Sequence, residues 1–132
     1  MTTPGYSGKP LPEKLGVKPG MTVYVDGGPD HTAELLGGTS YTARLPKHAD
    51  LTMLFTTTRA RLEKRLPLVV DRTVTNGMVW VCWPKKAAKV PTDLDENVVR
   101  RTGLDLGVVD VKVAAVDETW SGLKFVRRLK DR

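Results

Sequence analysis

The chain has 132 residues, of which 40% are hydrophobic and 27% charged, as is typical of one folded domain. Its 21 Lys and Arg against 15 Asp and Glu give a formal charge of +6, which favours acidic partners. One cysteine excludes an internal disulfide, and no apolar run is long enough to span a bilayer. We therefore expect a cytoplasmic bacterial protein with a single domain over residues 1–132, in which residues 1–9 form an extended lead-in.

The first half of the chain alternates short structured segments with turn-forming residues. Residues 10–15 predict one helical turn, and residues 21–25 predict a strand because they are rich in β-branched and aromatic side chains. Residues 31–36 predict a short helix that ends at a pair of glycines. Residues 39–45 and 51–56 predict two further strands, of which the second is apolar enough to be buried on both faces.

The second half begins with residues 62–74, where apolar side chains recur at helical spacing. Pro67 interrupts this segment and predicts a kink or a break into two helices. Residues 79–83 are apolar at every position, which indicates a central strand covered by helices on both faces. Thr92 is a good N-cap for a helix that we expect to run to about Thr102.

The last segments, residues 108–116 and 120–129, predict two antiparallel strands joined by a short turn, with Leu123 and Phe125 on the core face. The alternating side chains of residues 79–83 should face opposite layers of helices. The whole order predicts an α/β fold, a compact Rossmann-like three-layer sandwich with a mostly parallel sheet and a C-terminal antiparallel hairpin. This arrangement is similar to the back half of class I methyltransferases, a likeness of fold that says little about function.

Several short segments are distinctive. They are GYSG at 5–8, KLG at 14–16, KPG at 18–20, WPKK at 83–86, TDL at 92–94, VDVKV at 109–113 and DETWSGLK at 117–124. The chain resembles, through these segments, a small bacterial family of one-domain proteins of unknown function. The resemblance spans nearly the whole chain except residues 26–50. It implies a single domain and the α/β fold, and it brings no activity or cofactor with it.

The turn at residues 26–29, with sequence DGGP, follows the first predicted strand, where a dinucleotide-binding loop would lie. Its glycines do not have the Gly-x-Gly-x-x-Gly spacing, and Pro29 removes one N–H donor. Residues 42–45 contain no carboxylate that would bind a ribose. An ordinary strand-to-helix turn is therefore the favoured interpretation, and the sequence identifies no cofactor.

The candidate ligand site lies where the central strand ends. Lys85 and Lys86 follow this strand directly, and Thr92 begins the next predicted helix, whose N-terminus would add partial positive charge. Trp83 and Trp120 could form an apolar wall if the hairpin turn folds back over that end. These residues predict a site for an anion such as a phosphate or a carboxylate. A solvated loop is the competing interpretation.

Other polar residues are candidates for a catalytic role. Asp117 and Ser121 could act as base and nucleophile, but a serine nucleophile needs a histidine nearby, and both His31 and His48 lie in the first half. A structural role in the hairpin turn is therefore favoured. Cys82 lies inside an apolar strand, which predicts a buried and unreactive thiol. We expect no metal site, because the histidines lack further ligands at suitable spacing.

These observations favour a non-catalytic binding module for an anionic small molecule or a protein partner, without membrane contact. Two alternatives stay open. One is a degenerate nucleotide- or methyl-donor-binding enzyme that acts on an anionic small molecule. The other is a nucleic-acid-binding protein, for which the basic residues would have to gather on one face among aromatic side chains.

Overall fold

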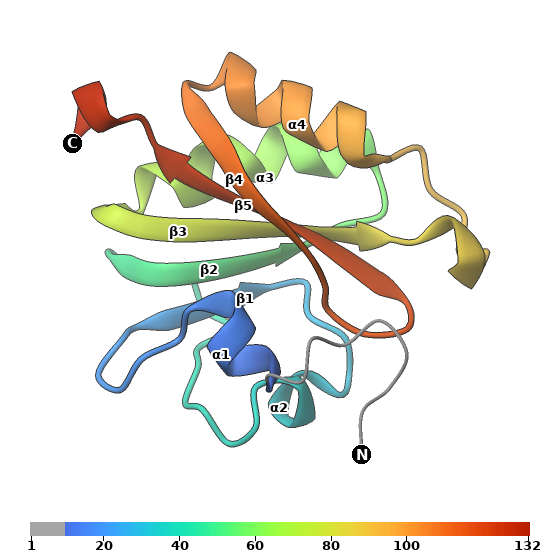
Figure 1. The fold of residues 1–132 in the computed structure, drawn as a ribbon, viewed down its shortest axis with the longest axis horizontal. Helices are drawn as coiled ribbons and strands as arrows, with labels where there is room; N and C mark the ends of the chain where they lie inside the picture. Colours follow the sequence, from blue (N-terminus) through green and yellow to red (C-terminus); the bar gives the residue numbers. More distant parts are fainter. Residues whose placement is uncertain (1–9) are drawn as a thin grey trace.

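A computed structural model describes residues 10–132, so the expected lead-in at residues 1–9 lies outside the described residues. One five-stranded sheet lies between two layers of helices (Figure 1). The strands are β1 (Val23–Asp26), β2 (Ala49–Phe55), β3 (Thr73–Pro84), β4 (Val108–Ala115) and β5 (Trp120–Arg127). The helices are α1 (Leu11–Leu15), α2 (Thr32–Leu35), α3 (Arg59–Asp71) and α4 (Glu96–Asp105), with 3-10 turns at Lys86–Ala88 and Leu129–Asp131.

The strand order in the sheet is β1-β2-β3-β5-β4. Strands β1, β2 and β3 are parallel, whereas β5 pairs antiparallel with β3 and β4 pairs antiparallel with β5. The predicted α/β Rossmann-like class with a C-terminal hairpin is confirmed. The sheet is less parallel than expected, because each strand of the hairpin forms an antiparallel pair.

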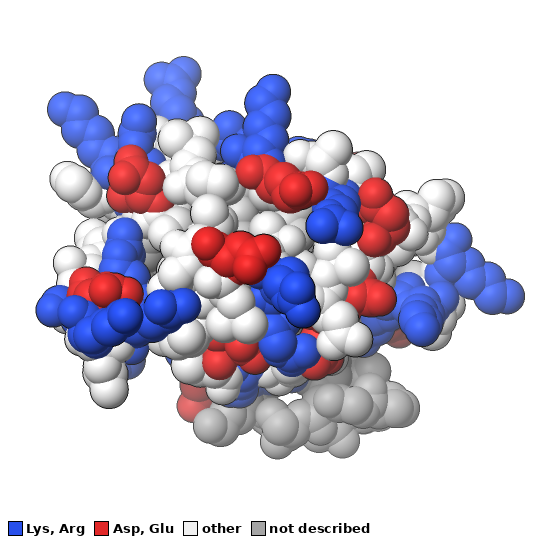
Figure 2. Space-filling model, turned by 90° about the horizontal axis from the view of Figure 1, so that it is seen from above, with Lys and Arg blue, Asp and Glu red and all other residues white. Residues whose placement is uncertain are grey.

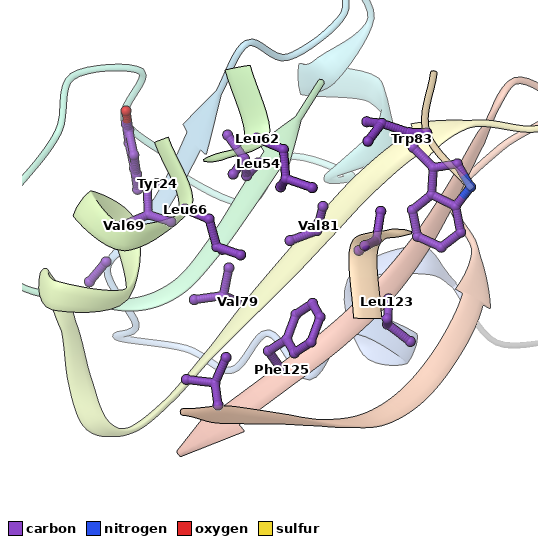
Figure 3. Packing of buried hydrophobic residues seen from close by; sticks show 14 residues of the cluster. Tyr24, Leu54, Leu62, Leu66, Val69, Val79, Val81, Trp83, Leu123 and Phe125 are labelled. Atoms are coloured by element: carbon purple, nitrogen blue, oxygen red, sulfur yellow. The ribbon is translucent and has the colours of Figure 1, made fainter. Parts of the chain in front are cut away.

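The central position of β3 explains why the run at residues 79–83 is apolar throughout. Val79, Val81 and Trp83 pack against the layer that contains α3 and α4 (Figure 3). Trp80 and Cys82 pack against the layer that contains α1 and α2, as predicted. Leu123 and Phe125 of β5 are also buried, in the first of these clusters, as predicted. The indole N–H of Trp80 donates to the carbonyl oxygen of Leu15 at 2.9 Å, which fastens α1 to the sheet.

The predicted strand at residues 39–45 is wrong. Only Thr42 pairs with β1, through an isolated bridge to Tyr24 in which its N–H and carbonyl oxygen bond the backbone of Val23 and Val25, each at 2.9 Å. The Thr42 hydroxyl also accepts a hydrogen bond from the N–H of Arg44 at 3.1 Å. Such a local side-chain bond competes with strand pairing and turns the chain away after one residue.

Pro67 does not divide the helix, since α3 is continuous from Arg59 to Asp71. Proline lacks the N–H that would bond the carbonyl of Glu63, but both residues lie on the exposed face, where water can satisfy that carbonyl. The buried Leu66 and Val69 on the other face hold the helix against the sheet. The helix also ends earlier than predicted, because residues 73–78 already belong to β3.

The N-cap of α4 is Asp95, not Thr92. The Asp95 carboxylate accepts a hydrogen bond from the N–H of Val98 at 2.9 Å. Thr92 lies in the preceding loop, where its hydroxyl donates to the carbonyl oxygen of Thr57 at 2.6 Å. Thr92 therefore joins this loop to the start of α3 instead of beginning a helix.

Candidate functional site at the carboxyl edge of the sheet

A hollow of about 350 Å³ lies at the carboxyl end of β3. Three of the five predicted site residues line it, namely Trp83, Lys85 and Lys86. The remaining lining residues are Pro84, Leu94, Asp95, Glu96, Asn97 and Ser121. The hollow thus combines an apolar floor, two ammonium groups and several oxygen acceptors at the edge where ligands gather in parallel sheets.

The charged side chains that line this hollow differ in whether they have a bonding partner. Among the described residues, Lys85 and Lys86 form no ion pair. The two acidic residues already have partners, because Asp95 caps α4 and Glu96 bonds Arg100 on the next turn. The hollow therefore presents two ammonium groups that are available to a carboxylate or phosphate.

The other two predicted site residues lie elsewhere. Thr92 bonds Thr57 in the loop before α4 and is not among the lining residues. Trp120 packs on the opposite face of the sheet, with the α1 and α2 layer. Its ring meets Phe55 edge-on, with centroids 5.1 Å apart and an interplanar angle of 89°. The two tryptophans therefore do not form one wall around a ligand, since Trp83 lies on the α3 and α4 side.

At the end of β1, the charges are paired with one another. The buried Asp26 carboxylate accepts hydrogen bonds from Arg61 and from Nε of Arg65, the latter at 2.7 Å. Arg65 also donates to the Tyr24 hydroxyl at 3.0 Å. The hydrogen bond to Asp26 raises the pKa of the Arg65 guanidinium, and burial raises the pKa of Tyr24. Two guanidinium groups thus balance one buried carboxylate.

The glycines that follow Asp26 are packed against protein atoms. A Cβ at Gly27 would lie 2.8 Å from the carbonyl oxygen of Phe55 and 3.0 Å from Nη2 of Arg61. A Cβ at Gly28 would lie 2.5 Å from the hydroxyl oxygen of Thr32. The missing side chains therefore make room for other parts of the chain, while both glycines are exposed to solvent.

A histidine and a carboxylate meet at the same edge, on the α1 and α2 side. Nε2 of His31, which follows the glycine turn, lies 2.7 Å from Oδ2 of Asp117 in the hairpin turn. Oδ1 of Asp117 accepts hydrogen bonds from the backbone N–H groups of Thr119 and Trp120 at 2.8 and 2.7 Å. The prediction that both histidines lie away from the hairpin is wrong for His31. Strands that run in the same direction place the turns that follow them at the same edge of the sheet. The predicted order of strands could therefore have indicated that the loop after β1 and the hairpin turn after β4 lie near each other.

The remaining candidates do not extend this set. Cys82 is fully buried, and burial, together with the charge of Asp117, raises the pKa of its thiol. Within residues 10–132, no three His, Cys, Asp or Glu side chains lie close enough to hold a metal ion. Among the same residues, no helix is long and apolar enough to cross a membrane.

Charge on the surface is mixed on the side where α4 lies in Figure 1. Figure 2 shows this side, with acidic side chains lying among the Lys and Arg side chains. This face therefore does not gather the basic residues into the continuous surface that a nucleic-acid-binding protein would need.

Comparisons with known proteins bear on the fold. No protein-family model matches the chain, and no curated protein sequence does. Among solved structures, a SAM-dependent methyltransferase from Aquifex aeolicus is similar, with a TM-score of 0.57, 16% identity and coverage of 86% of this chain and 85% of that one. Ribosomal protein L11 methylase from Lactobacillus delbrueckii subsp. bulgaricus is also similar, with a TM-score of 0.56 and 16% identity. The match covers 88% of this chain and 74% of that one.

A third similar structure is magnesium protoporphyrin IX methyltransferase from Synechocystis PCC 6803 with bound SAM. Its TM-score is 0.56 at 11% identity, with coverage of 83% of this chain and 71% of that one. At these identities the likeness shows the fold, which is that of SAM-dependent methyltransferases. The finding contradicts our expectation of a non-catalytic binding module, because these three similar structures are named as methyltransferases or methylases.

Proposed function

We propose that this protein is a methyl-donor-dependent enzyme, and that its donor, a sulfonium nucleoside of the adenosylmethionine type, binds in the hollow at the end of β3. The observation that carries the proposal is a hollow of about 350 Å³ lined by Lys85 and Lys86, which form no ion pair with any residue from 10 to 132. This hollow lies at the carboxyl end of the central strand of a methyltransferase fold. When bound, such a donor supplies an electrophilic methyl group on a positively charged sulfur.

The chemistry of the lining residues fits this donor. Its amino-acid carboxylate matches the ammonium groups of Lys85 and Lys86. Its ribose hydroxyls match the side-chain oxygens of Asn97 and Glu96. We assign no part of the donor to the glycine turn after β1, because the room at these glycines is taken up by Phe55, Arg61 and Thr32.

Calorimetric titration with three nucleosides tests the proposal. Adenosylmethionine and adenosylhomocysteine should both bind, because both carry the amino-acid carboxylate. Methylthioadenosine lacks that group, so its affinity should be lower by about tenfold or more, the usual worth of a charge-assisted hydrogen bond. If the protein binds none of the three, the proposed function is wrong.

Variants then locate the site. Replacement of both lysines (K85A with K86A) should weaken adenosylhomocysteine binding to the level of methylthioadenosine. A matched control removes two exposed lysines outside the hollow (K64A with K130A) and so lowers the net charge equally. Equal losses in both double variants would mean a general charge effect. Unchanged affinity in the first would place the ligand away from β3.

A further inference from the structure

We infer that the hairpin of β4 and β5 carries a separate anion site, in which Lys112 and Lys124 bind a phosphate monoester. Such a group is supplied by a phosphorylated small molecule or by a phosphorylated protein. The site lies on the face of the hairpin that α4 does not cover, and neither lysine lines the hollow at the end of β3. The inference therefore does not depend on the proposed function.

The register of the sheet places the two lysines side by side. Lys112 of β4 lies directly opposite Lys124 of β5 in the antiparallel ladder. Side chains of directly opposed residues point to the same face, with Cβ atoms about 4.5–5.5 Å apart. Lys124 also lies opposite Trp80 of β3, which packs with the α1 and α2 layer. Lys112 is exposed and Lys124 half-buried, so a ligand can reach both ammonium groups from that side.

A third lysine, Lys14 at the end of α1, borders this pair. The ammonium of Lys112 donates to the carbonyl oxygen of Lys14 over 3.4 Å, and the ammonium of Lys14 donates to the carbonyl oxygen of Ala115 over 3.3 Å. Both bonds are long, and both acceptors are uncharged backbone oxygens. An ammonium carries three N–H donors, so Lys112 keeps donors and its full charge for a ligand.

The protein itself does not neutralise the two lysines. Neither Lys112 nor Lys124 forms an ion pair with any residue from 10 to 132. Asp110, the acidic residue nearest to Lys112 in the sequence, bonds Arg100 of α4 on the other face. Burial, and then the charge of Lys112, lowers the pKa of the Lys124 ammonium. Like charges directly opposite each other destabilise a sheet, and a bound anion would offset that repulsion.

A phosphate monoester fits this pair better than other anions. Its second pKa is about 6, so near neutral pH it carries up to two negative charges, whereas a carboxylate or a phosphodiester carries one. Lysine binds phosphate as a point charge, whereas a planar carboxylate is matched best by the fork of an arginine. Trp80, the ring opposite Lys124 in the ladder, is fully buried, so a nucleic-acid base cannot stack on it.

Titration with inorganic phosphate tests the site. The protein carries K85A with K86A, so the lysines of the hollow cannot respond, and the Cε signals of ¹³C-labelled lysine are followed by NMR. Phosphate replaces chloride at constant ionic strength and at a pH where phosphate is a dianion. The signals of Lys112 and Lys124 should shift with one common Kd, and the pKa of Lys124 should rise, because a bound anion favours the charged amine. If neither signal responds to phosphate, the inference is wrong.

Variants separate binding from a structural role. K112M and K124M keep an unbranched side chain but remove the charge, so each should weaken phosphate binding about tenfold. The control K64M removes an exposed lysine elsewhere and should leave the affinity unchanged. Without phosphate, K124M should be at least as stable to urea as its parent, because the like-charge repulsion is gone. Unchanged affinity in K124M together with a loss of stability would make the lysine structural and overturn the inference.

Three further ligands identify the source of the phosphate group. Glycerol 3-phosphate represents small molecules, and a phosphoserine peptide represents proteins. Tighter binding of either one than of inorganic phosphate, lost in K124M, supports the site and names the source. A short oligonucleotide carries only phosphodiesters and should bind more weakly than both. If the oligonucleotide binds most tightly and K124M weakens it, the ligand is a nucleic acid and the assignment to a monoester is wrong.

Discussion

The ends of β1 and β3 lie on the same edge of the sheet, but their charged side chains differ in whether they are bonded to one another. At the end of β1, the Asp26 carboxylate is buried and bonded by two guanidinium groups from α3. At the end of β3, the ammonium groups of Lys85 and Lys86 have no ion-pair partner among the described residues and border a hollow. The comparison shows that the glycine turn after β1 makes room for Phe55, Arg61 and Thr32, and that the nearby charges are already bonded to one another. The chemistry available to a ligand lies two strands away.

The largest expected effect comes from breaking the charge cluster at β1. The substitution Asp26→Asn keeps the shape of the side chain but leaves two guanidinium groups without their carboxylate. We expect a loss of about 3 kcal/mol in the free energy of unfolding, the lower end of the range for breaking a buried ion pair, since Arg61 is partly exposed. Urea unfolding followed by circular dichroism measures it.

The lysines at β3 provide the contrast for this prediction. The double variant K85A with K86A removes exposed or half-buried charges and should change the free energy of unfolding by less than about 0.5 kcal/mol. Binding of adenosylhomocysteine should respond in the reverse order, strongly to the lysines and little to Asp26→Asn at a temperature where both variants are folded. A stable Asp26→Asn variant that has lost the ligand would reverse our assignment of the two strand ends.

The second prediction concerns the glycine turn. In Gly28→Ala, the new methyl group would lie 2.5 Å from the Thr32 hydroxyl oxygen and 2.7 Å from Cγ1 of Val25. We expect a loss of about 1–3 kcal/mol in the free energy of unfolding because of this crowding, with unchanged ligand affinity. Adding Thr32→Ala should recover part of the loss, because it removes the nearer atom. A Gly28→Ala protein that is as stable as wild type but binds no ligand would show that the glycine makes room for the ligand instead.

Much of the fold could be predicted from the sequence because burial leaves a strong pattern. The run at residues 79–83 is apolar at every position, and β3 is indeed covered on both faces. Local competition was harder to judge. Thr92 and Asp95 are both good N-caps three residues apart, and only the bond between Thr92 and Thr57 decides between them. The prediction of a strand at residues 39–45 was wrong for a similar reason, because the Thr42 hydroxyl bonds the N–H of Arg44 and turns the chain.

In the candidate site too, residues that are close in sequence could be predicted together, whereas contacts between distant residues could not. Trp83, Lys85 and Lys86 follow one another along the chain, so their common place at a strand end could be predicted. The pair of His31 and Asp117 is separated by 86 residues and depends on how the hairpin turn approaches the first loop. The contact between Asp26 and α3 could have been predicted from the sequence. Arg61 and Arg65 are four residues apart, so one face of a helix carries both towards the same carboxylate.

The smallest expected effect concerns the two ion pairs that Arg100 forms beside the hollow. Arg100 bonds Glu96, which lines the hollow, and also bonds Asp110 on β4, with Nε 2.9 Å from Oδ2. The hydrogen bond from Arg100 holds the pKa of Asp110 below its ordinary value of 3.8. A carboxylate with a lowered pKa contributes stability that is fully present above pH 3.8 and is lost as the pH falls through the lower folded value.

Asp110→Asn removes this contribution at every pH. The free energy of unfolding of wild type should therefore exceed that of the variant slightly near neutral pH, because the pair is partly exposed, and the two should converge in acid. Urea unfolding at a series of pH values between neutrality and the acid limit gives the difference. A difference that grows as the pH falls would mean that Asp110 is destabilising when ionised. In that case the bond to Glu96, and not the bond to Asp110, would hold the Arg100 side chain.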